Sequence, residues 1–198
     1  MARADTRTRI LAAARDLMLK RGYAATPVDE ICSAAGVSKG SLYHFFASKE
    51  EVGLAVLNAF YREGMARVGT GDYLRIADPY GRLMGFFDHL EATAPEFWRH
   101  GCLMGNFATE LAESSPIIHA RVAELLHELV AGVTPLFRAV ADDPAEATGL
   151  AEQLLMVLEG AIILARAHDD PAWISAGARR FRRTIEARAA GAGAVEPS

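Results

Sequence analysis

The sequence predicts an all-α protein of about nine helices: an N-terminal three-helix helix-turn-helix head followed by a C-terminal helical bundle. Apolar residues recur at helical spacing along the chain, and runs that alternate as in β-strands are nearly absent. Prolines and capping residues stand where helices would begin. The 198 residues, 51% of them hydrophobic, can bury a core without the help of disulfides or a structural zinc ion.

The first quarter of the chain predicts several short, sharply bounded helices. Capping residues mark the expected starts and glycines the ends: Thr26 with Pro27, Ser38, and Ser48 with Glu51 for the starts, and Gly22 and Gly36 for the ends. A helix over 27–35, a brief helix after Ser38 and a longer helix after Ser48 follow from these signals.

The rest of the chain predicts longer helices. They are expected over 79–93, 95–113, 116–141, 144–168 and 171–189, with Pro95, Pro116, Pro144 and Pro171 at or near their starts. A proline is tolerated there because the first N–H groups of a helix have no partner within it.

The segment Val28 to Phe46, VDEICSAAGVSKGSLYHFF, has the pattern of a helix-turn-helix. Gly36 supplies the tight turn, and the second helix opens with small, polar or cationic residues that suit a major groove about 12 Å wide. The run T-P-V-D-E-I…A-A-G-V-S-K-G-S-L-Y-H-F-F-x-S-K-E, preceded by R-x-x-I-L-x-A-A…R-G-Y, resembles the DNA-binding domain of TetR-type transcriptional regulators over about residues 5–55.

The resemblance implies which residues meet a double-stranded DNA operator. It places Lys39, Ser41 and His44 at base edges or nearby phosphates, Thr26, Tyr43 and Lys49 at phosphates, and Ser38 and Gly40 at the helix tip. Phe45 stands where the family usually has histidine or tyrosine, so one phosphate contact is in doubt. The resemblance further implies a helix-turn-helix domain over 1–50 and a ligand-binding and dimerisation domain over 51–190. We expect a frayed tail over 191–198.

The charge distribution agrees with this assignment. Residues 1–49 hold eight Lys and Arg against four Asp and Glu, which gives a net charge of +4. The remaining residues carry a net charge of −8, so the whole chain has a net charge of −4. A basic head on an acidic body suggests that the head meets a polyanion, although a chance fluctuation of a few charges would look the same.

The middle of the chain holds candidates for an effector pocket or sensor. We expect aromatic, methionine and polar side chains of this region either to line an apolar pocket or to fill the bundle core. They are Phe86, Phe87, Trp98, Met104, Asn106, Phe107, Met156 and Glu159. Cys102 lies in a Gly-Cys-Leu run that resembles a subset of TetR-type regulators that respond to electrophiles or oxidants. Arg99 and His100 could lower the pKa of its thiol, but unpaired cysteines are more often small, inert core residues, and Cys102 could be one of these.

The helices at 144–168 and 171–189 carry apolar stripes that suit either a dimer interface or burial within one chain. Phe181 is one member of these stripes, and Gly160 would allow close backbone approach.

No catalytic or metal-binding motif occurs, so we expect no enzyme, no metal and no cofactor. The sequence predicts a cytoplasmic protein with no membrane segment. The resemblance to TetR-type regulators implies a homodimeric DNA-binding repressor that a small-molecule effector releases from a palindromic operator. The alternative is a helical small-molecule-binding or enzymatic protein with a vestigial head.

Overall fold

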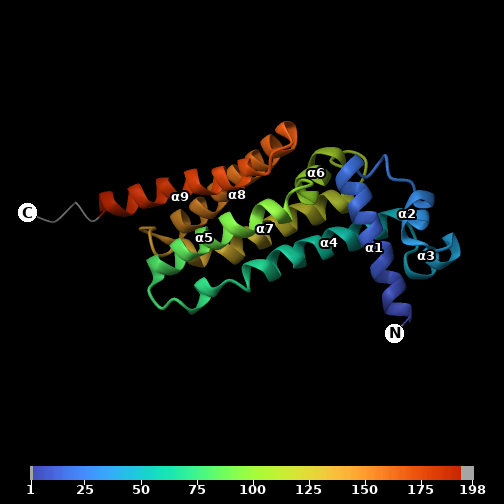
Figure 1. Cartoon of the computed structure of the whole chain (residues 1–198), viewed down its shortest axis with the longest axis horizontal. Helices are drawn as coiled ribbons and strands as arrows, with labels where there is room; N and C mark the ends of the chain where they lie inside the picture. The colour runs from blue at the N-terminus through green and yellow to red at the C-terminus, as the bar shows by residue number, and fades with distance from the viewer. Residues whose placement is uncertain (1, 193–198) are drawn as a thin grey trace, which may run out of the picture. The chain divides into compact units, whose positions relative to one another are not determined.

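The computed structural model describes residues 2–192, and helices dominate this range (Figure 1). The elements are α1 (Ala2–Arg21), α2 (Val28–Ala35), α3 (Lys39–Phe45), α4 (Lys49–Val68), the 3-10 turn η1 (Asp72–Arg75), α5 (Pro79–Phe97), α6 (Leu103–Glu110), α7 (Pro116–Phe137), α8 (Pro144–His168) and α9 (Ala172–Ala192). The described residues thus contain nine α-helices and no strand, which confirms the predicted fold class.

The chain forms two compact units. The first contains the residues up to Glu63 together with Cys102–Leu126, and the second contains Gly64–Gly101 and the described residues from His127 onward. The first unit extends beyond the expected boundary at residue 50 because later segments bond to it. Ser115 Oγ donates to Glu50 Oε1 at 2.6 Å, and Arg121 Nε donates to Asn58 Oδ1 at 3.0 Å.

Of the tail expected over 191–198, residues 191 and 192 belong to α9, and the remaining six lie outside the described residues.

The predicted caps around the helix-turn-helix form almost as expected. Ser38 Oγ accepts the Ser41 N–H at 3.1 Å at the start of α3, and Ser48 Oγ accepts the Glu51 N–H at 3.1 Å at the start of α4. Gly36 ends α2 at φ 63° and ψ 42°, a left-handed conformation that favours glycine. These local signals set the lengths of α2 and α3.

The predicted helix over 95–113 is wrong. Pro95 lies inside the last turn of α5, and the helix that follows covers only Leu103–Glu110. A proline inside a helix leaves the carbonyl four residues earlier without its usual donor. That carbonyl belongs to Glu91, and Ser175 Oγ of α9 donates to it at 3.0 Å, so the neighbouring helix makes Pro95 tolerable.

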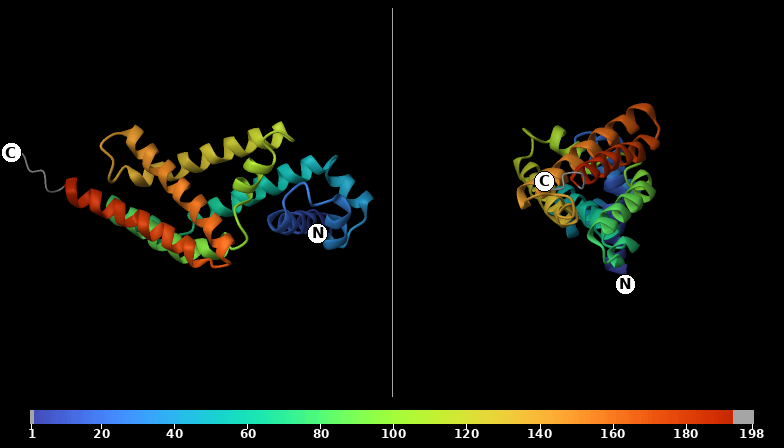
Figure 2. Two further views of the ribbon diagram at one scale, coloured as in Figure 1. Left: turned by 90° about the horizontal axis from the view of Figure 1, so that it is seen from above. Right: turned by 90° about the vertical axis from the view of Figure 1, so that its left-hand side faces the viewer.

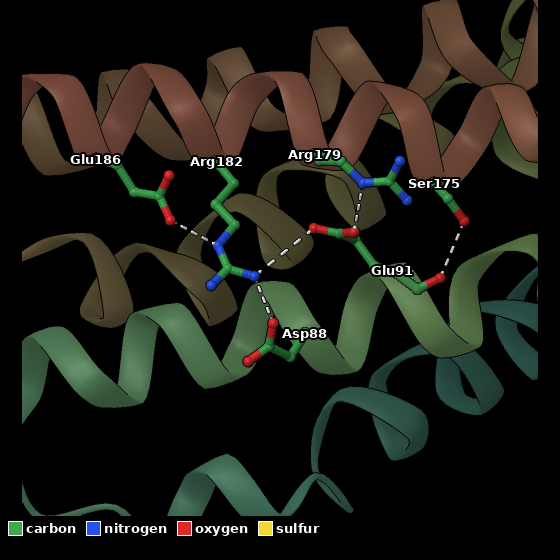
Figure 3. Close-up of polar contacts among 6 residues, drawn as sticks. All are labelled: Asp88, Glu91, Ser175, Arg179, Arg182 and Glu186. Carbon is green, nitrogen blue, oxygen red and sulfur yellow. Dashed lines mark hydrogen bonds and ion pairs between the residues drawn. The ribbon is translucent and has the colours of Figure 1, made fainter.

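The second unit is held together by α9, which packs along both α5 and α8 (Figure 2). Polar contacts reinforce the α5–α9 contact (Figure 3). Arg179 Nε pairs with Glu91 Oε2 at 3.0 Å, and Arg182 contacts Asp88 and also pairs with Glu186 at 2.9 Å. Several of these side chains are partly buried, so the pairs help to fix the register of α9 on α5.

The core of this unit contains most of the apolar stripes of α8 and α9. Phe181 is 6% exposed, and its ring lies 6.1 Å from that of Phe87 and 6.2 Å from that of Phe137. The other inward-facing members are Leu150, Leu154, Leu158, Ala161, Ala165, Ile174, Ala178 and Ile185. Of the two readings left open by the sequence, burial within one chain therefore holds for these residues.

By length and composition alone, α8 is the one helix in the described range that could cross a membrane. This is weak evidence for a span, because a core helix of a globular protein passes the same test. One face of α8 is buried and packs against α9, as in a helix that belongs to a protein core.

Candidate nucleic-acid interface

Helix α3 buries very little of itself. Leu42, which is fully buried, is its one buried residue, and α3 packs against α2, where Ile31 and Ala35 are also buried. Lys39, Gly40, Tyr43 and His44 are exposed, as is Ser38 just before the helix. A seven-residue helix held by one leucine, with its polar residues outside, has a large surface left for a partner.

The tip of α3 is fixed by hydrogen bonds among serines. Ser38 Oγ lies 3.0 Å from Ser41 Oγ and also accepts the Ser41 N–H. A Cβ placed on Gly40 would meet nothing closer than Ser38 Oγ at 3.8 Å, which is an ordinary contact. The chain itself therefore does not require glycine at this position.

Lys39 forms an ion pair with Asp29, an acidic residue that the sequence pattern did not mark as part of the site. Its Nζ lies 2.6 Å from Asp29 Oδ1 of α2, and both side chains are more than half exposed. The two helices of the motif are thus joined by an exposed ion pair at the tip of α3. Asp29 stands in the first turn of α2, where an acidic residue also suits the helix dipole, so its position gave no specific signal.

The aromatic residues of α3 take different positions. Tyr43 is 49% exposed, so its phenol hydroxyl can be reached by a partner. Phe45 is half-buried, and its ring meets the exposed His44 ring edge-on at 5.2 Å between centroids. Phe45 therefore restricts the orientation of the His44 imidazole.

Lys49 begins α4 and lies over an aromatic ring. Its Nζ is 4.3 Å from the Tyr23 ring centroid and 3.4 Å from the Ala24 carbonyl oxygen. Burial lowers the pKa of Lys49, and the nearby Glu110 carboxylate partly opposes this effect. The ammonium group is therefore oriented from within the protein.

Thr26 does not match its expected roles. Its side chain is fully buried, and its hydroxyl donates to the Gly22 carbonyl oxygen at 2.7 Å. Pro27, and not Thr26, stands at the N-cap of α2, and no side chain caps that helix end. The hydroxyl closes the turn between α1 and α2, so it is not available for the phosphate contact that the resemblance implies.

The residues expected to line an effector pocket are divided between the two units. Met104, Asn106 and Phe107 belong to the first unit with Cys102; Phe86, Phe87, Trp98, Met156 and Glu159 belong to the second. Met156 is 68% exposed on α8, so it lines no enclosed space among the described residues of the single chain, and its place in an effector pocket stays a prediction. Phe86 and Phe87 are buried in contact with each other. The indole N–H of Trp98 is buried and has no acceptor among the described residues.

Both cysteines are buried. Cys102 is 2% exposed and stands directly before α6 as its N-cap. The Arg99 guanidinium, which we expected to act on this thiol, is exposed and lies 3.9 Å from the Glu96 carboxylate. Burial raises the pKa of Cys32, as expected for a structural thiol.

A cavity of about 180 Å³ lies in the first unit between α1 and α4, and none of the residues expected in a pocket lines it. It is lined by Thr8, Leu11, Ala12, Arg15, Val56, Ala59, Phe60 and Glu63, and an Arg15–Glu63 ion pair of 3.1 Å stands among them. Among the described residues, no group of three His, Cys, Asp or Glu side chains is placed to hold a metal ion.

Comparisons with known proteins agree with this geometry. The sequence-family model for bacterial regulatory proteins of the tetR family matches residues 10–56, which include α2 and α3. The model of the C-terminal domain of LmrA/YxaF-like transcriptional regulators matches residues 82–180. The two models together cover the helix-turn-helix and much of the helical body.

Similar proteins are also regulators. The transcriptional regulator AcuR of Cereibacter sphaeroides is 31% identical over 188 residues, covering 90% of this chain and 84% of AcuR. The repressor DhaR of a Mycobacterium species is 31% identical over 130 residues, covering 66% of this chain and 64% of DhaR. The crystal structure of a regulatory protein TetR from Rhodobacter sphaeroides is 28% identical, with a TM-score of 0.76 over 89% of this chain and 96% of that one. The chain therefore belongs to the TetR family of DNA-binding transcriptional regulators, which are not enzymes.

Proposed function

We propose that this chain is a cytoplasmic, homodimeric repressor that binds an inverted-repeat operator through α3 and leaves it when a small effector binds the body. The observation that carries the proposal is the exposed polar surface of α3 above the single buried Leu42. The recognition helix of a helix-turn-helix enters the major groove with its N-terminal residues at base edges. Lys39, Ser41 and His44 would have this role, with Ser38 and Gly40 at the tip.

Two contacts supported by the geometry would position the head on the phosphate backbone. Tyr43 presents a half-exposed phenol, and Lys49 presents an ammonium oriented by Tyr23. Gly40 leaves room for the backbone of the helix tip to approach the DNA, since nothing within the chain requires glycine there.

The outer face of α8 supports the homodimer. One stripe at alternating spacings of four and three residues faces away from the core: Gly149, Gln153, Met156, Gly160, Ile163 and Ala167. Met156 and Ile163 are 68% and 67% exposed, and a Cβ at Gly149 or Gly160 would meet no atom within 4 Å. Small residues between exposed apolar ones would let two α8 helices approach closely about a two-fold axis.

The effector would bind in the body, and the buried indole N–H of Trp98 suggests one contact. A buried donor without an acceptor is unfavourable unless a ligand supplies one, so a carbonyl or carboxylate group of the effector would fit it.

A covalent effector would act instead at Cys102, where an added group would crowd the buried start of α6. In that case a thiol reagent such as iodoacetamide would release the wild-type protein from DNA but leave Cys102→Ser bound.

The experiment that tests the proposed function is selection of binding sites from a random duplex library by the purified full chain. The proposal expects an inverted repeat to be enriched, with an affinity that falls steeply as salt increases in fluorescence anisotropy. The alternative, a small-molecule-binding protein with a vestigial head, expects no enriched sequence. The exposed Lys39 side chain at the tip of α3 favours the first outcome, because a cation at this position can contact DNA.

A further inference from the structure

The turn between α1 and α2 is held by a carboxylate from a distant part of the chain. Glu110, at the end of α6, accepts the Tyr23 N–H on Oε2 at 2.8 Å and the Ala24 N–H on Oε1 at 2.6 Å. All three residues belong to the first compact unit. A carboxylate that accepts two successive amides fixes both the position and the orientation of the turn, because each oxygen has its own donor.

The surrounding residues leave this turn little freedom. Gly22 has φ +87°, and a Cβ on it would lie 2.7 Å from Glu110 Oε2. The Tyr23 ring meets the Phe107 ring of α6 edge-on at 5.7 Å, and a Cβ at Gly53 of α4 would lie 2.8 Å from Tyr23 Cε2. The glycines at both positions thus allow α4 and α6 to hold the turn between them.

The Glu110 carboxylate also interacts electrostatically with Lys49. The Lys49 ammonium lies above the Tyr23 ring and 3.4 Å from the Ala24 carbonyl, so the amide groups of the turn face Glu110 while one of its carbonyls faces Lys49. The charge of Glu110 favours the protonated form of Lys49, against the larger effect of burial. Glu110 therefore influences both the turn and a cation on the proposed DNA face.

The turn leads directly into the reading helices. The Thr26 hydroxyl bonds to the Gly22 carbonyl, Pro27 is the N-cap residue of α2, and α2 packs against both α1 and α3. We propose that Glu110 is a positioning residue for DNA recognition: by clamping the amides of Tyr23 and Ala24 it sets the placement of α2, α3 and Lys49. This inference rests on the proposed function, since it requires that the head read a DNA sequence.

A clamp that merely stabilises the fold makes a different prediction. Loss of folded protein lowers binding to every duplex by the same factor, whereas misplacement of α3 lowers binding mainly to the preferred sequence. The informative quantity is therefore the ratio of affinities for the selected duplex and for a scrambled duplex of equal length.

The test compares three variants of the full chain: Glu110→Ala, Glu110→Gln and the control Glu113→Ala. Glu113 is exposed close to the end of α6, so its substitution removes the same charge without touching the turn. Affinities for the selected and scrambled duplexes are measured by fluorescence anisotropy, and amide hydrogen exchange follows the Tyr23 and Ala24 N–H groups.

We expect Glu110→Ala to reduce the affinity ratio about tenfold or more and to speed exchange at both amides, because two charge-assisted hydrogen bonds are lost. Glu110→Gln should be intermediate, since its side-chain carbonyl can accept one amide but its NH₂ group cannot accept the other. Glu113→Ala should keep the wild-type ratio.

The inference is overturned if Glu110→Ala keeps the wild-type ratio, or if Glu113→Ala lowers it equally. It is also overturned if exchange at Tyr23 and Ala24 is unchanged in Glu110→Ala. Failure of the wild-type protein to enrich any sequence would instead contradict the proposed function, so the two failures are distinguishable.

Discussion

The DNA-reading head and the α8–α9 pair use apolar residues in different ways. In α3 a single buried residue, Leu42, attaches seven residues to the core, and Lys39, Gly40, Tyr43 and His44 are exposed. In α8 one apolar face packs inward against α9, while a second face with Met156 and Ile163 points outward. A short motif therefore reveals its binding face through its pattern, but a long helix with two apolar faces does not reveal which one is covered by its own chain.

The largest effect should come from breaking the inner face. Phe181→Ala removes a ring that packs against Phe87 and Phe137, and it should lower the free energy of unfolding by about 3–5 kcal/mol. Ile163→Ala, on the outer face, should change the stability of the monomer by less than about 0.5 kcal/mol. Urea denaturation at low protein concentration measures both, and equal losses would contradict the assignment of the two faces.

A charge on the outer face should break assembly while the fold is kept. Ile163→Glu would place carboxylates at the proposed α8–α8 contact, so sedimentation should show a monomer with an unchanged helical circular dichroism spectrum. Affinity for an inverted repeat should then fall by about 10²-fold or more, because the two half-sites are no longer bound together. Ile117→Glu, at another exposed isoleucine, is the matched control and should stay dimeric.

A smaller effect is expected where the head meets phosphate. Lys49→Ala should weaken binding to all duplexes alike and reduce the salt slope of log K by about 1 for each lost contact. Lys20→Ala, which removes a lysine from α1, provides the comparison. An unchanged slope in Lys49→Ala would show that its ammonium serves only the Tyr23 turn.

The smallest effect concerns the ion pair at the tip of α3. Asp29→Asn should release Lys39 and remove a negative charge beside the proposed DNA face, which should raise affinity for all duplexes a few-fold. The gain is limited because an exposed ion pair contributes only about 0.2–1 kcal/mol. Asp16→Asn, on the exposed surface of α1, is the control, and a loss of affinity in Asp29→Asn would contradict this account.

The head was largely predictable because its signals are local. Gly36, Ser38 and Ser48 act on neighbouring residues, and the structure confirms the turn and the two caps that they predict. Thr26 was misassigned because Pro27 takes the cap position and the buried threonine hydroxyl bonds backwards to Gly22.

Contacts between residues far apart in the chain could not be predicted from the sequence. Glu110 lies 87 residues from Tyr23, and no spacing rule connects them. Pro95 indicated a helix start, but a hydroxyl from α9 satisfies the carbonyl that this proline leaves open, so α5 continues. In both cases the deciding partner comes from a helix that packs alongside only after folding.

The central claim is that the exposed side chains of α3 read a base sequence. Parallel selection from a random duplex library with the wild-type protein and His44→Ala tests it most directly. The account predicts that the wild type enriches an inverted repeat with half-sites about 34–36 Å apart or a multiple of this. The His44→Ala variant should enrich the same repeat with relaxed preference at one position in each half-site, a loss of about 1–3 kcal/mol there. Identical base preferences in the two proteins would contradict the reading role of His44, and no enrichment by the wild type would contradict the claim as a whole.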